Sequence, residues 1–216
     1  MERLRFRAIG EILYEVMTGL LFYPRTLWRV LLWPTESWSP VRLERAEGDR
    51  TVVNGPPPDL VSPPLFLLIS IVLAHVLDLS LRGGAGEALG PLLFRALAFS
   101  LFPLVMAAGT LRRQGRPIDH ATLREPFELQ CLCAAPFALS LSVAVILIRS
   151  PVASTRLAGG AIGLAAVTWH LSVQTRWLRR RLAVDSFQAF RTAAWLFAVT
   201  LFCCLPPALL ILGRAG

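Results

Sequence analysis

Long apolar stretches separated by short polar ones dominate the chain after residue 63. Five such stretches run over about residues 64–81, 89–111, 127–148, 157–178 and 189–212. Each carries few charges and is near the ~20 residues that an α-helix needs to cross the hydrocarbon core of a bilayer. The pattern predicts an all-α, polytopic membrane protein whose residues 64–213 form a five-transmembrane-helix bundle.

A different periodicity marks the start of the chain. Between residues 4 and 21, six apolar side chains recur at helical spacing, and most charged side chains fall elsewhere. These apolar residues are Phe6, Ile9, Leu13, Val16, Met17 and Leu20. The spacing predicts an amphipathic helix. We expect it to break near Pro24, because proline lacks a backbone donor and clashes with the preceding turn.

Residues 25–38 are too few to cross a bilayer, and they interleave tryptophans with arginines before Pro34 stops any helix. Because amphipathic aromatic rings and arginines favour the boundary between lipid and water, we expect an interfacial helix here. The predicted membrane-interface anchors are Trp28, Arg29, Trp33 and Trp38. Residues 1–38 would thus form an N-terminal arm of amphipathic and interfacial helices.

Residues 39–63 are polar and rich in residues that interrupt helices, including the prolines at 56–58. This composition predicts a proline-rich linker of irregular structure. The chain would therefore consist of the arm (1–38), the linker (39–63) and the transmembrane domain (64–213).

Arginines alternate between the two ends of the five predicted helices. Eight lie before the first helix, and four lie in each of the second-to-third and fourth-to-fifth connections. The first-to-second connection holds one arginine, the third-to-fourth connection holds two, and the C-terminal end holds one. Since positive residues concentrate on the cytoplasmic side, this alternation predicts a cytoplasmic N-terminus and an external C-terminus. Adding or removing one helix would destroy the alternation, which favours the count of five.

Composition agrees with a membrane placement. Hydrophobic residues make up 55% of the 216-residue chain and charged residues 17%, and the mean hydropathy is +0.57. The net charge of +8 would suit nucleic acid, but the arginines lie between apolar segments, as they do in membrane loops. We therefore expect the lipid bilayer, and other membrane proteins or further copies of this chain, as partners, and no nucleic acid.

All basic residues are arginine, which indicates a GC-rich bacterial genome because arginine codons are GC-rich. The expected location is therefore a bacterial inner (cytoplasmic) membrane. The four cysteines all lie in apolar segments, which argues against a secreted disulfide framework.

The stretch 29–38, Arg-Val-Leu-Leu-Trp-Pro-Thr-Glu-Ser-Trp, resembles the opening of bacterial Yip1-domain proteins. In that family a short apolar helix precedes a proline, a polar pair and a tryptophan. Later stretches are similar too: a helix ending in Gly109 before a basic loop at 112–117, Ala-Ala-Pro at 134–136, and a last helix opening at 187–194.

The resemblance covers roughly residues 25–212. It implies a five-helix membrane domain with a cytoplasmic N-terminus. Eukaryotic relatives are linked to vesicle trafficking and small GTPases, whereas the bacterial family brings no common activity and no catalytic residues.

Polar side chains within the predicted helices are the natural place to look for chemistry, because each is costly in lipid and tends to face the protein interior. The candidates form a predicted intramembrane polar cluster of His75, Asp78, Glu128 and His170. A metal site could draw on them and on a nearby cysteine, but no two show zinc-ligand spacing. We therefore expect hydrogen-bonded structural residues, with no metal and no cofactor.

Two further features concern helix packing. Arg95 either snorkels outward or pairs with Asp78, and we expect snorkelling. Gly159 and Gly163 form a G-x-x-x-G pattern that permits close helix approach, which we expect to serve packing within the chain more than a dimer interface.

Asp119 and His120 invite a catalytic interpretation, but no adjacent nucleophile or metal-binding motif accompanies them. Alternatively, Asp119 caps a short helix. The chain also has no P-loop, dinucleotide fingerprint or haem attachment motif. We expect no catalytic residues.

The combined expectation is a non-enzymatic integral membrane protein that assembles with or organises other membrane components, as a Yip1-like scaffold or accessory subunit. The alternative is a transporter or channel component, which requires a water-accessible cavity lined by His75, Glu128, Gln130 and His170. A membrane-embedded enzyme using the 115–125 loop is the hypothesis that the sequence favours least.

Overall fold

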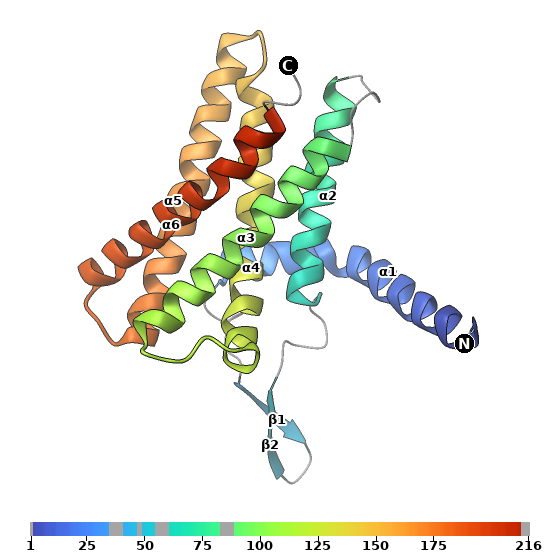
Figure 1. The fold of residues 1–216 in the computed structure, drawn as a ribbon, viewed down its shortest axis with the longest axis vertical. Coiled ribbons are helices and arrows are strands. Elements are labelled where there is room, and N and C mark those ends of the chain that lie inside the picture. Colours follow the sequence, from blue (N-terminus) through green and yellow to red (C-terminus); the bar gives the residue numbers. More distant parts are fainter. Residues whose placement is uncertain (1, 35–40, 47–48, 55–60, 83–88, 213–216) are drawn as a thin grey trace.

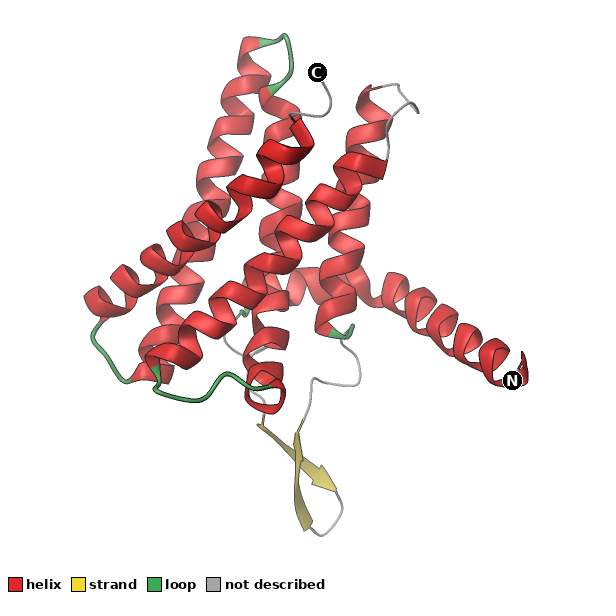
Figure 2. Cartoon of the chain, viewed as in Figure 1, coloured by secondary structure: helices red, strands yellow, loops and turns green. Residues whose placement is uncertain are grey.

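A computed structural model of the chain describes residues 2–34, 41–46, 49–54, 61–82 and 89–212. These residues form six α-helices and one two-stranded hairpin, so the fold is all-α apart from the hairpin (Figure 1, Figure 2). In chain order the elements are α1 (Glu2–Leu32), β1 (Val41–Ala46), β2 (Asp49–Asn54), α2 (Pro63–Arg82), α3 (Leu89–Arg113), α4 (His120–Ile148), α5 (Ala153–Leu182) and α6 (Ser186–Leu212).

The helices α2 to α6 form a bundle with α4 at its centre. Helix α4 packs against α2, α3 and α5, and α6 packs against α3 and α5. Every residue of α4 from Leu129 to Ala138 is buried. A helix that is apolar all round is expected to be buried all round, and this part of α4 is the core of the bundle.

Four helices are long and apolar enough to cross a membrane, which is compatible with an integral membrane protein. The qualifying stretches are Pro63–Leu81, Leu92–Arg113, His120–Ile148 and Ser186–Cys204, in α2, α3, α4 and α6. Helix α5 is 30 residues long but does not qualify within the described residues. The polar residues His170 and Gln174 lower the mean hydropathy of α5. The predicted number of five membrane-spanning helices is therefore not confirmed.

The predicted break near Pro24 is wrong, because α1 continues from Glu2 to Leu32. A proline inside a helix costs ~3 kcal/mol through its missing hydrogen bond and its steric clash. Tyr23, Thr26 and Val30 lie on both sides of Pro24 and are all buried. Their packing against the rest of the chain offsets the cost of the proline and keeps the helix whole.

The connection between the second and third predicted segments is shorter than expected. Helix α3 runs past Gly109 to Arg113, and α4 begins at His120 instead of near residue 127. Gly115 has a positive φ of 66° and ends α3. Its backbone N–H donates to the carbonyl of Arg112, and the next N–H donates to the carbonyl of Leu111, a pattern that satisfies the last carbonyls of a helix.

The linker contains regular structure that we did not expect. Strands β1 and β2 pair in antiparallel register from Val41 opposite Asn54 to Ala46 opposite Asp49. The prediction of irregular structure is therefore wrong for these twelve residues. The available signal was Gly48, which follows the alternating apolar and polar residues 41–44 and precedes Thr51, Val52 and Val53, residue types that favour strands.

Candidate functional site

The predicted polar cluster separates into different levels of the bundle. At one level, Arg95 of α3 places Nη2 2.7 Å from Oδ2 of Asp78 in α2, and Nη1 donates to the carbonyl of Ala74 at 3.3 Å. The two charged side chains are only 14% and 8% exposed. The expectation that Arg95 snorkels is wrong. A buried carboxylate on the adjacent helix lies within reach, and burying either charge alone would be costly.

His170 lies in an aromatic cluster at the centre of the bundle. Helices α3, α4, α5 and α6 each contribute one ring, namely Phe102, Phe137, His170 and Phe197. The imidazole centroid is 4.7 Å from the Phe137 ring and 5.1 Å from the Phe102 ring, and the side chain is 0% exposed. His170 therefore acts as a core ring that joins four helices.

His75 is also buried, and it shares a face of α2 with Asp78. Neither ring nitrogen of His75 or of His170 has a hydrogen-bond partner within the described part of the chain. Both histidines therefore contribute mainly packing.

Glu128 lies well away from His170. It precedes Phe137 by nine residues on α4, which corresponds to about 13 Å of helix rise. Its Oε1 accepts from Arg124 Nε at 2.9 Å, one turn earlier on the same helix. The four predicted cluster residues thus do not form one site, and among the described residues no three His, Cys, Asp or Glu side chains converge as metal ligands would.

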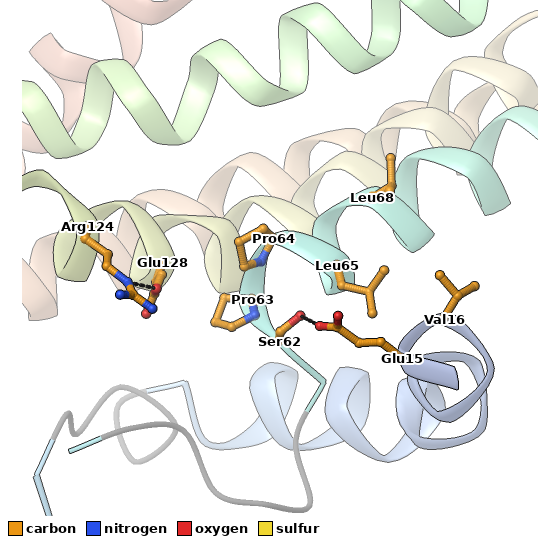
Figure 3. Close-up of a pocket in the computed structure, with 9 residues that line it drawn as sticks. All are labelled: Glu15, Val16, Ser62, Pro63, Pro64, Leu65, Leu68, Arg124 and Glu128. Carbon is orange, nitrogen blue, oxygen red and sulfur yellow. Dashed lines mark hydrogen bonds and ion pairs between the residues drawn. The ribbon is translucent and has the colours of Figure 1, made fainter. Parts of the chain in front are cut away.

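Glu128 instead lines a cavity of about 620 Å³ between α1, the start of α2 and the start of α4. Figure 3 shows Glu15 of α1 pointing toward Ser62, with Arg124 and Glu128 on the opposite side. The Ser62 hydroxyl donates to Glu15 Oε1 at 3.1 Å, which tethers α1 to the start of α2. Both carboxylates therefore make local contacts, Glu15 with Ser62 and Glu128 with Arg124.

The other side chains expected to line a transport cavity are core residues. Gln130 of α4 and Gln174 of α5 form two amide hydrogen bonds, Nε2 to Oε1, of 3.1 and 2.5 Å. Both side chains are almost fully buried. Gln130 is a candidate from the sequence alone, but Gln174 is not. The presence of a second amide side chain in another apolar segment was the available indication of a hydrogen-bonded pair. The pair holds α4 and α5 in register.

The glycines of the G-x-x-x-G pattern face α4. A Cβ built at Gly159 would lie 2.8 Å from the Ala144 carbonyl oxygen, and one at Gly163 would lie 3.5 Å from the Ala144 Cβ. By contrast, a Cβ at Gly160 would meet nothing within 4 Å. The backbones of α4 and α5 therefore approach closely at Gly159, where a side chain would collide with the α4 backbone.

Asp119 is the N-cap of α4. Its Oδ1 accepts from the backbone N–H of Thr122 at 2.8 Å, and the Thr122 hydroxyl accepts from the backbone N–H of Asp119 at 3.2 Å. The hydrogen bond from the Thr122 backbone N–H, aided by the Thr122 side chain, lowers the pKa of Asp119 below its usual value. This reciprocal arrangement is a capping box. The Asp119 carboxylate is thus committed to the helix, and His120 beside it is exposed.

The arm, α1, crosses the bundle on one side, and its N-terminal half extends away from the other helices (Figure 1). It packs against α2 and α4. The Tyr23 hydroxyl lies 2.9 Å from the Ser70 hydroxyl, and the Trp169 indole of α5 donates to the Leu31 carbonyl at 3.4 Å. The last contact satisfies a carbonyl that the end of a helix would otherwise leave without a partner. These contacts fix the C-terminal half of α1.

Of the predicted interface anchors, Trp28 lies on the outer side of α1, and Trp33 directly follows the helix. Trp28 is 64% exposed and Trp33 50% exposed, whereas Arg29 is half-buried. Trp38 lies outside the described residues. Exposed apolar side chains at spacings of three, four and seven residues lie along the same side of α1, with the exposed Arg25 between Leu21 and Trp28. The resulting outer stripe comprises Tyr14, Met17, Leu21, Trp28 and Leu32.

Among the described residues, the bundle combines a buried interior with an apolar outer surface. Its buried polar side chains pair with one another or pack in the core, and its uncovered apolar side chains lie on α1 and on the outer faces of the bundle. Comparisons with protein-family models, with curated proteins and with solved structures find no match to this chain.

Proposed function

We propose that the chain is a non-enzymatic component of a bacterial inner membrane that assembles with or organises other membrane components through α1. The observation that carries this proposal is the outer stripe, which stays exposed while the opposite face of α1 is buried. A large apolar surface of this kind usually marks contact with lipid or with another protein.

The side chains around α1 support a position at the boundary between lipid and water. Tyr23 and Val30 face the bundle, and Leu21 and Trp28 face away from it. With about 100° between successive residues, Arg29 lies on the edge that separates these two apolar faces. A helix with one polar edge and two apolar faces fits a site with water at the edge, the bundle on one face and lipid or a partner on the other.

We further propose that α5 is a fifth membrane span. It lies beside α4, and its exposed side chains include Leu157 and Leu164, which suit contact with lipid. With five spans, the arginine alternation puts α1 on the cytoplasmic side. This layout is the one that the resemblance to Yip1-domain proteins implies, and we propose a scaffold or accessory role on that basis.

The proposal is tested by extracting the full chain in mild detergent and measuring its assembly state by native mass spectrometry. We expect further copies or co-purifying membrane proteins. Replacing Leu21 and Trp28 of the outer stripe by serine should abolish the assembly. The matched control replaces Leu157 and Leu164 of α5 by serine and should keep it. A wild-type chain recovered as a lone monomer, or equal loss in both variants, would overturn the proposal.

A further inference from the structure

A groove between α3 and α6 has an apolar lining. It encloses about 730 Å³, which falls within the range of roughly 300–1,000 Å³ common for small-molecule sites. Val105 and Ala108 of α3 form one wall, and Trp195 and Val199 of α6 form the other. Both helices are long and apolar enough to cross a membrane, so the groove belongs to the outer surface of two candidate spans.

Small residues on α3 create this groove. A Cβ at Gly109 would collide with the side chain of Leu196, so the glycine lets α6 approach the α3 backbone closely at this point. Leu196 is almost fully buried and forms the floor of the groove. Beside it, Ala108 is too short to fill the space above that floor. The groove therefore follows from the residue sizes of α3.

Two arginines stand at one end of the groove. Arg112 and Arg113 occupy the last turn of α3, line the groove and are exposed. Within the part of the chain that the structure describes, neither guanidinium takes part in an ion pair or a side-chain hydrogen bond. The nearest carboxylate in the sequence, Asp119, is committed to capping α4. The arginines are thus available for an external anion.

We propose that this groove binds an anionic phospholipid, with its phosphate at Arg112 and Arg113 and an acyl chain along the apolar walls. Guanidinium groups hold phosphate oxygens through short charge-assisted hydrogen bonds. Trp195 is 60% exposed on the groove wall, and an indole in such a position suits the headgroup level of a bilayer. Basic pockets between membrane helices are suited to acidic headgroups.

The site is separate from the outer stripe of α1. Helix α1 packs against α2 and α4, whereas the groove lies between α3 and α6. The inference requires that α3 and α6 lie in a membrane, but it does not depend on a partner for α1. A negative result in the assembly test of α1 therefore leaves the lipid proposal standing.

The test uses the full chain in detergent micelles and native mass spectrometry with added phosphatidylglycerol or phosphatidylcholine of the same acyl chains. We expect the wild-type chain to retain phosphatidylglycerol in preference to phosphatidylcholine. Replacing Arg112 and Arg113 by glutamine should weaken phosphatidylglycerol binding about tenfold or more, because these two guanidinium groups line the groove and would hold the lipid phosphate there. The matched control, Arg149→Gln with Arg156→Gln, removes two exposed arginines elsewhere and should stay within about twofold of wild type.

A second variant tests the apolar part of the site. Ala108→Phe should fill the groove and reduce phosphatidylglycerol binding although both arginines remain. The elution volume in gel filtration checks that each variant keeps its fold. Equal retention of both lipids, equal loss in the control variant, or full displacement by glycerol phosphate at the concentration of the lipid would overturn the proposal.

Discussion

The amide pair between α4 and α5 makes a quantitative prediction. Gln174→Leu removes two hydrogen bonds, each worth about 0.6–1.7 kcal/mol between membrane helices. It also leaves the Gln130 amide buried without a partner, which costs roughly 1–3 kcal/mol. Since these figures describe overlapping parts of one effect, we expect a loss of about 2 kcal/mol in the free energy of unfolding. Gln130→Leu should behave in the same way, because the bonds are reciprocal.

The double variant Gln130→Leu with Gln174→Leu removes both amides and places two leucines in contact. We expect it to be more stable than either single variant and within about 1 kcal/mol of wild type, because no buried polar group then lacks a partner. Unfolding by a graded rise in sodium dodecyl sulfate would be followed by tryptophan fluorescence, since Trp177 is buried one turn from Gln174. Gln188→Leu, at an exposed position, controls for the substitution itself. Destabilisation of the double variant by the sum of the single effects would refute the reasoning.

Three further predictions follow from packing and charge. Gly159→Leu should destabilise the chain by more than about 2 kcal/mol in the same unfolding assay, whereas Gly160→Leu should be close to neutral because its Cβ meets open space. Asp78→Leu should lower the melting temperature strongly by leaving Arg95 buried without its carboxylate, and a second change, Arg95→Leu, should restore much of it; no recovery would contradict the pairing. Capping hydrogen bonds lower the pKa of Asp119, so its contribution to the stability of α4 is present above the usual aspartate pKa and is lost as pH falls through the lower folded value. Hydrogen exchange at the start of α4 should therefore rise as the pH falls through that range. Asp119→Asn should remove this pH dependence.

The apolar segments could be located from the sequence because length and composition alone decide whether a helix is able to cross a bilayer. All five predicted segments are helical in the structure. Helix ends were harder to place. The sequence offers Asp119 as a cap but predicts the apolar helix only from about residue 127, because the polar residues that follow the cap resemble a loop, whereas α4 begins at His120. At Pro24, packing of the residues on either side outweighs the local preference of proline to end a helix.

The pairing of polar residues could not be predicted, because it depends on which helices are neighbours. Gln130 and Gln174 are 44 residues apart, and nothing in either local sequence indicates the other. His170 resembled a ligand when considered alone. Its environment is decided by three phenylalanines from three other helices, which only the folded bundle brings together. Candidate chemistry inferred from single polar residues in apolar segments is therefore weak until their neighbours are known.

Most charged and amide side chains within the bundle form ion pairs or hydrogen bonds with one another, and this limits which surfaces of the chain are free to bind a ligand. The Asp78–Arg95 ion pair and the Gln130–Gln174 amide pair each join two helices and leave little capacity for an outside ligand. Exposed guanidinium groups remain at the end of α3, where the groove meets the arginines, and exposed apolar side chains remain on α1. Since a bilayer offers phosphate and hydrocarbon at its boundary with water, both surfaces match the chemistry of that layer. The interior of the bundle therefore determines how its helices pack, and the surfaces that it leaves open to an outside ligand are the groove between α3 and α6 and the outer stripe of α1.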